Sequence, residues 1–277
     1  MDDAPDDKPA ARFGRAFLDG LSVAGGAFTR GARAVGGAVA AGYRAVDPDV
    51  RRHVAQLPLV GLSAVVPRDE VIDALPDDGH PPLLFVHGLG GHRGNFTPMR
   101  TAFELMGRSR SYGLSLSDGL DLDALGERLR ADIRRVIAVN GLPDEAKVDV
   151  VAHSMGGVVT RVALEDPETA ARVRTVVTLG TPHRGTYAAR YADTLRARAL
   201  RPRSELMTRL AAQEPWVGPP TMPRLVCFWS EADMMILPAE GATVEGAESV
   251  EMEGFTHAGY LLHPRCFGRV FEVLGRG

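Results

Sequence analysis

Short apolar runs alternate with segments of helical periodicity over most of the chain. Four runs rich in β-branched residues each end in small or polar residues, and they cover 83–86, 148–152, 173–179 and 225–229. A fifth segment, 249–253, alternates apolar and polar positions as a strand does. Continuous apolar runs of this length are typical of strands buried on both faces of a parallel sheet.

Helical spacing separates these strands. One group is Leu125, Leu129, Ile133, Val136 and Ile137, with Asp121 as the expected N-cap, and another is Val158, Val159, Val162 and Ala163. Strands that alternate with helices predict, over 61–277, an α/β domain whose mostly parallel central sheet is flanked by helices.

The connection 184–222 is much longer than two neighbouring elements need and is rich in Arg, Ala and Pro. It predicts a small helical cap or lid inserted into the domain. The residues expected on its apolar face are Tyr187, Tyr191, Leu195, Leu206, Leu210 and Trp216.

Two further segments precede the α/β pattern. Residues 1–12 are acidic and predict a disordered tail, whereas 13–60 is a Gly/Ala-rich segment with apolar residues every three or four positions. Between residues 11 and 55, seven arginines and three aspartates give a local charge of +4 (7 − 3). A basic amphipathic helical extension has three interpretations: packing on the catalytic domain, peripheral contact with a membrane or lipid surface through 13–46, or an unconventional targeting segment.

Composition narrows the class of protein. With 277 residues, 45% of them hydrophobic, and a net charge of -3, the chain has the composition of a globular protein and no basic field for a nucleic-acid partner. Cys227 and Cys266 lack metal-binding spacing, so no metal and no cofactor is expected. Four aspartates in the first ten residues disfavour a signal peptide. A cytoplasmic or peripheral membrane location is favoured, and secretion stays open.

The strongest chemical signal is the segment Val150-Val151-Ala152-His153-Ser154-Met155-Gly156-Gly157, in which a strand runs into a small-His-Ser-x-Gly turn and then a helix. This is the nucleophile-elbow pattern, with alanine in place of the first glycine. Such a turn raises the serine hydroxyl above the sheet, near the positive end of the following helix. Ser154 is therefore the candidate nucleophile, supported by His153 and Gly156.

A glycine-rich loop, His87-Gly88-Leu89-Gly90-Gly91, follows the first strand. In folds with this elbow, such a loop supplies one oxyanion donor and the residue after the nucleophile supplies the other. We assign these donors to the backbone N–H groups of Leu89 and Met155. Gly88 allows close approach, and His87 orients the loop through a hydrogen bond.

The acid and the base follow the nucleophile along the chain in this arrangement. Asp233 comes just after the strand 225–229, at the carboxyl edge where ligands bind, and Glu231 and Glu240 are its rivals. His257 lies between the strand 249–253 and the last helix, and is preferred as base over His263.

Together these motifs resemble the bacterial lipases and esterases of the α/β-hydrolase superfamily, especially small triacylglycerol lipases with an alanine-opened elbow. The resemblance covers about 83–272 and rests on 86–91 with Asn95-Phe96, 151–157, 179–185, 230–234 and 257–262. It implies an α/β-hydrolase fold with Ser154, Asp233 and His257 as a catalytic triad. This chain departs from the smallest such lipases, which are secreted and nearly lidless, in its N-terminal extension, its insert 184–222 and the lack of a clear signal peptide.

The residues predict a serine hydrolase that cleaves carboxylic esters through an acyl-enzyme, with acyl-chain lipidic esters as the favoured substrates. Two alternatives stay open. An acyltransferase or thioesterase would use the same triad, and a lipid-surface-binding protein would keep the hydrolase core as a scaffold.

Overall fold

The computed structural model describes residues 72–116 and 119–276. The expected acidic tail 1–12, the extension 13–60 and its lipid-contact stretch 13–46 lie outside the described residues. They stay predictions.

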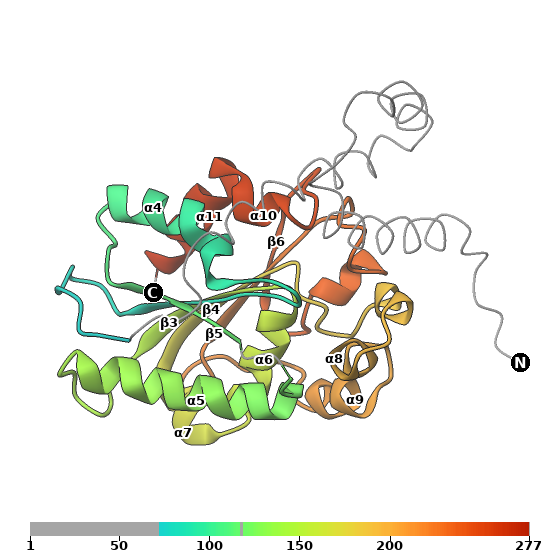
Figure 1. Ribbon diagram of the computed structural model, residues 1–277, viewed down its shortest axis with the longest axis horizontal. Helices are drawn as coiled ribbons and strands as arrows, with labels where there is room; N and C mark the ends of the chain where they lie inside the picture. Colours follow the sequence, from blue (N-terminus) through green and yellow to red (C-terminus); the bar gives the residue numbers. More distant parts are fainter. Residues whose placement is uncertain (1–71, 117–118, 277) are drawn as a thin grey trace, which may run out of the picture.

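A six-stranded sheet in the order β2-β1-β3-β4-β5-β6 forms the centre of the molecule, and every neighbouring pair is parallel (Figure 1). The strands are β1 (Leu83–Val86), β2 (Ser111–Leu114), β3 (Val148–His153), β4 (Val173–Leu179), β5 (Arg224–Trp229) and β6 (Glu248–Glu251). The predicted parallel α/β sheet is confirmed. Strand β2 has no counterpart in the sequence prediction, because Ser-Tyr-Gly-Leu lacks the β-branched run of the other strands.

The register aligns the carboxyl ends of the central strands. Val86 pairs with Ala152, His153 with Leu179, and Leu179 with Phe228. The loops that follow β1, β3, β4 and β5 therefore leave the sheet at one edge, where ligands bind in folds of this kind. The last strand, β6, ends at Glu251 and not at residue 253, because the chain turns after Met252, whose carbonyl accepts the Phe255 N–H (3.1 Å).

Helices cover both faces of the sheet (Figure 1). One face carries α5 (Leu122–Val139) and α6 (Met155–Ala163), and the other carries α4 (Thr97–Leu105), α10 (Gly259–Leu262) and α11 (Pro264–Leu274). The shorter helical elements are η2 (Arg93–Phe96), α7 (Pro167–Ala171) and η4 (Ala239–Ala242). Asp121 caps α5 as predicted, since its carboxylate accepts the Ala124 N–H (2.8 Å).

Alternate side chains of the central strands β1, β3, β4 and β5 contribute to two apolar cores. Val150 and Val176 belong to the core under α5 and α6, whereas Val151 and Val177 belong to the core under α4, α10 and α11. Continuous apolar strands are therefore required, because both faces of the sheet are buried. Among the described residues, no helix is long and apolar enough to cross a bilayer.

The insert between β4 and β5 contains η3 (Tyr187–Tyr191), α8 (Leu195–Ala199) and α9 (Glu205–Ala211). Only part of its predicted apolar face is correct: Leu206, Leu210 and Trp216 are buried in the core, but Tyr187 and Leu195 are 39% and 72% exposed. Helix α9 is the part of the insert that packs into the core. Buried Arg161 of α6 holds it there by donating to the carbonyl of Leu210 (2.5 Å).

Candidate active site

Ser154 lies in the sharp turn between β3 and α6. Its backbone has φ 54 and ψ -128, a conformation that side-chain-bearing residues rarely adopt. The Ser154 N–H donates to the carbonyl of Leu179 (2.9 Å), and the Ser154 carbonyl accepts the Gly157 N–H (3.1 Å). Backbone strain of this kind costs about 1–3 kcal/mol and concentrates at functional sites.

The loop after β1 lies against this turn. A Cβ placed on Gly88 would stand 2.7 Å from Ser154 Cβ, and one placed on Gly156 would overlap the carbonyl oxygen of Val86. Only glycine permits these approaches. The loop is therefore held close enough to Ser154 for its backbone to face a reacting group there.

His87 fixes the loop through both ring nitrogens. Nδ1 lies 2.9 Å from the carbonyl oxygen of Gly88, and Nε2 accepts the Leu116 N–H (3.0 Å). Because a carbonyl only accepts and an amide only donates, the ring carries its proton on Nδ1. Leu89 comes next in the same loop and is 43% exposed, whereas Met155 is buried as the first residue of α6.

Asp233 and His257 form a hydrogen-bonded pair. His257 Nδ1 lies 2.9 Å from Asp233 Oδ2 and 3.1 Å from Oδ1. The aspartate side chain is 1% exposed and the imidazole 15%. Glu231 and Glu240, the alternative candidates for the acid, are both exposed. His263 lies elsewhere, since its ring caps α11 by accepting the Arg265 N–H (3.1 Å).

The ends of β3 and β4 bring the elbow and the acid–base pair together. Gly180 directly follows Leu179, the residue that accepts the Ser154 N–H. A Cβ on Gly180 would stand 2.6 Å from Asp233 Oδ2 and 3.2 Å from His257 Nδ1. On the other side, the ring of His153 lies 4.5 Å from that of His257, between centroids. The sequence-predicted residues therefore gather at one edge of the sheet.

Two residues that the sequence interpretation missed hold the loops of this edge. Buried Ser230 accepts N–H groups from Ala232 (3.2 Å) and Phe255 (3.1 Å), so it joins the loop of Asp233 to the loop of His257. Buried Thr186 donates to the carbonyl of Met235 (2.8 Å) and joins the start of the insert to the Asp233 loop. The only sequence signal for them is that each follows a strand or a glycine near the predicted triad.

Burial shapes the protonation of nearby groups. It lowers the pKa of His153 and of His183 well below the ordinary value of 6.5. Burial also raises the pKa of Tyr260, and the nearby charge of Asp233 raises it further. These three groups are therefore uncharged at neutral pH.

The described part of the chain contains no group of three or more His, Cys, Asp or Glu residues arranged to hold a metal ion. Cys227 and Cys266 are buried free thiols, and burial raises their pKa values to about 11 and about 12.

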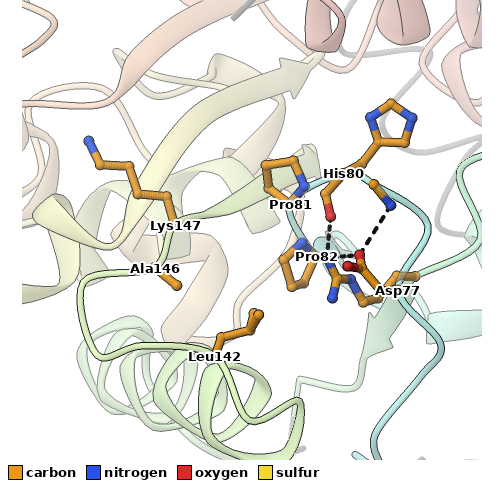
Figure 2. A pocket seen from close by; sticks show the side chains of 9 residues that line it. Asp77, His80, Pro81, Pro82, Leu142, Ala146 and Lys147 are labelled. Carbon is orange, nitrogen blue, oxygen red and sulfur yellow. Dashed lines mark hydrogen bonds and ion pairs between the residues drawn. The ribbon is translucent and has the colours of Figure 1, made fainter.

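A hollow of about 280 Å³ lies at the opposite, amino edge of the sheet (Figure 2). Pro82 and Lys147 line it, and they directly precede β1 and β3. Asp77 forms an ion pair there with Arg110 (2.9 Å). The sheet therefore separates this hollow from Ser154.

Comparison with known families assigns the chain. The family described as "Domain of unknown function (DUF7379)" matches residues 54–220, more than half of the sequence. The chain belongs to this family. The DUF7379 match includes the elbow with Ser154 and the Gly88 loop, but it ends before Asp233 and His257.

Curated relatives agree with the resemblance to lipases and esterases. The chain is 32% identical over 113 residues to a triacylglycerol lipase of Pseudarthrobacter phenanthrenivorans and, over the same length, to one of Burkholderia plantarii. Each match covers 38% of this chain, and the chain spans only about a third of these curated relatives, 34% and 30%. The resemblance is confirmed for this part of the sequence.

The crystal structure of the Bacillus licheniformis lipase BlEst2 in its mature form has the same fold. It superposes with a TM-score of 0.59 at 18% identity, covering 75% of this chain and 96% of that one. The predicted α/β-hydrolase fold of this DUF7379 member is confirmed.

Proposed function

We propose that this protein is a serine hydrolase that cleaves carboxylic esters, with Ser154, Asp233 and His257 as its catalytic triad. The observation that carries the proposal is the buried Asp233–His257 hydrogen bond (2.9 Å) at the same sheet edge as a strained serine elbow. A carboxylate that fixes an imidazole beside a serine is the arrangement that activates hydroxyl nucleophiles. The lipase relatives support the same chemistry.

The reaction begins with proton transfer to the base. Because Asp233 only accepts, His257 holds a proton on Nδ1 and presents Nε2 as the basic atom. Nε2 takes the hydroxyl proton as Ser154 Oγ bonds to the ester carbonyl carbon. His257 then gives this proton to the departing alkoxide, which leaves as an alcohol, and Asp233 stabilises the transient imidazolium.

Water completes the cycle. His257 takes a proton from water while the hydroxide oxygen bonds to the acyl carbon. The bond between that carbon and Ser154 Oγ then breaks, a carboxylic acid leaves, and the proton returns to Ser154.

The developing oxyanion needs fixed donors. We assign this role to the N–H groups of Leu89 and Met155, because the first N–H groups of a helix lack intrahelical acceptors and Met155 begins α6. Gly88 supports this assignment, since it leaves no side chain between its loop and Ser154. His87, bonded to both Gly88 and Leu116, holds the loop in place.

We favour acyl-chain lipidic esters as the substrates, because apolar side chains are exposed on the surface. Large apolar side chains stand exposed in the Gly88 loop and in the insert: Leu89, Tyr187 and Leu195. Exposed apolar groups of this size suit an apolar substrate. The cap or lid role of 184–222 and the lipid contact through 13–46 belong to the same proposal.

A fluorophosphonate probe tests the nucleophile directly. Such a probe phosphonylates an activated serine, so the folded protein should gain one label on a peptide that contains Ser154. Ser154→Ala and urea-unfolded wild-type protein are the controls, and both should stay unlabelled. Labelling of another residue, or equal labelling of the folded and unfolded protein, would contradict the assignment.

A further inference from the structure

We propose that His153 is a positioning residue that holds the base against the nucleophile elbow by donating a hydrogen bond to the main-chain carbonyl of His257. This inference rests on the proposed function, because it assigns a role within the same site. The residue directly precedes Ser154 and is the last residue of β3. One position in the sequence thereby fixes both the nucleophile and the base.

The geometry defines the contact. His153 Nε2 lies 3.0 Å from the carbonyl oxygen of His257, and the two rings are 4.5 Å apart with planes inclined by 48°. Because a carbonyl oxygen only accepts, the proton must be on Nε2 of His153. The donor belongs to a strand and not to a loop, so it gives the base loop a rigid reference.

Further hydrogen bonds hold the flanks of this loop. Phe255 N–H donates to Ser230 Oγ (3.1 Å), and Gly259 N–H donates to Thr256 Oγ1 (3.1 Å). The bond from His153 reaches the main chain of His257, whereas Asp233 bonds to the imidazole ring. Its loss would leave the loop folded but would allow the imidazole to move relative to Ser154, and small displacements of reacting groups lower kcat strongly.

The charge state of His153 suits this role. Burial lowers its pKa, and the charges of His257 and His87 lower it further. The other ring nearby, Tyr260, is uncharged and 6.5 Å away. A neutral His153 adds no positive charge beside His257 at the moment when His257 becomes an imidazolium.

Two substitutions separate positioning from packing. His153→Phe keeps an aromatic ring but removes the donor, whereas His153→Gln keeps an N–H donor. With a soluble ester, we expect kcat of the Phe variant to fall about tenfold, the loss of one hydrogen bond, with KM unchanged. The Gln variant should recover most of kcat. His80→Phe, at the amino-edge hollow, is the control and should match wild type.

Equal kcat in wild type and His153→Phe would overturn the proposal. So would equal losses in the Phe and Gln variants that follow equal falls in thermal midpoint, since packing alone would then explain them. The ¹⁵N shifts of the His153 ring give a readout apart from activity. A neutral ring with its proton on Nε2 is expected at neutral pH, and titration near the ordinary value of 6.5 would contradict the contact. A wild-type protein that hydrolyses no ester would instead overturn the proposed function, and the role of His153 with it.

Discussion

Two buried aspartates lie at opposite edges of the same sheet and have different partners. Asp149, at the amino end of β3, is 0% exposed and accepts from Arg108 and from Arg174, whose Nε lies 2.9 Å from Oδ1. Asp233, at the carboxyl edge, is 1% exposed and pairs with His257. Both carboxylates are enclosed, yet one is paired with guanidinium groups and the other with an imidazole.

The difference lies in what each partner can do. Guanidinium groups keep their charge at every relevant pH and bind carboxylates with fixed geometry, so the Asp149 cluster can only hold β3 to its neighbours. An imidazole can both accept and donate a proton during a reaction, and the His257 side chain is 15% exposed. Burial of an acid therefore does not by itself indicate an active site. An imidazole partner close to a strained serine is the stronger indication.

Replacing the two aspartates should produce opposite phenotypes. Asp233→Asn keeps the size of the side chain but favours the wrong tautomer of His257, so kcat on a soluble ester should fall about ten-thousandfold. Asp149→Asn leaves buried Arg108 and half-buried Arg174 without their carboxylate, and it should lower the free energy of unfolding by about 3–5 kcal/mol. Initial rates and urea unfolding curves of both variants measure this.

The kcat of folded Asp149→Asn should equal that of wild type. If Asp149→Asn loses as much activity per folded molecule as Asp233→Asn, the two edges do not differ in function. Arg174→Gln is the milder substitute if Asp149→Asn does not fold, because it removes only one of the two cations.

Substitutions at two glycines separate the site from the rest of the fold, with a smaller expected effect on kcat than Asp233→Asn. Gly88→Ala places a Cβ 2.7 Å from Ser154 Cβ, so the loop must move away, and kcat should fall by about a hundredfold as an oxyanion donor is lost. Gly268→Ala is the matched control, since no heavy atom lies within 4 Å of its Cβ in α11. It should keep full activity and raise the free energy of unfolding by about 0.5–1 kcal/mol. An active Gly88→Ala enzyme would remove this loop from the site.

The smallest expected effect concerns stability and pH. The pKa values of His153 and His183 in the folded protein lie below the 6.5 of an unfolded histidine. The unfolded chain therefore binds protons first as pH falls, and the folded state loses stability below about 6.5. From about pH 7.5 to 5.5 each should cost about 1 kcal/mol.

Urea unfolding at both pH values measures this loss, with His183→Gln as the variant. The ring of His183 is buried in the core, with Nε2 3.0 Å from Thr178 Oγ1. Replacing it should therefore remove about half of the stability loss that the two histidines cause. If His183→Gln and wild type lose the same stability between the two pH values, His183 does not stay neutral in the folded protein.

Local patterns in the sequence predicted the parts of the fold that depend on local residue order. The β-branched runs predicted β1, β3, β4 and β5, and the elbow and glycine motifs predicted which residues meet at the carboxyl edge. Strand β2 was missed because it lacks a β-branched run, and Arg100 stabilises its first residue, Ser111, through two hydrogen bonds that no local pattern encodes.

Long-range polar contacts were also beyond the sequence. Arg161 looks like an ordinary surface residue of a helix, yet it is buried and bonds the insert through Leu210 and Gln213. The exposed positions of Tyr187 and Leu195 follow from this anchoring, since α9 occupies the core. Ser230 likewise acquires its role only when β5 and β6 are adjacent.

Hydrolysis of p-nitrophenyl esters with about two to sixteen acyl carbons, by wild type and by Ser154→Ala, tests the central claim most directly. Loss of the nucleophile should lower kcat about a million-fold. The account predicts wild-type activity that rises toward the longer chains and disappears in the variant. Equal rates for wild type and Ser154→Ala, or no hydrolysis of any chain length by wild type, would contradict it.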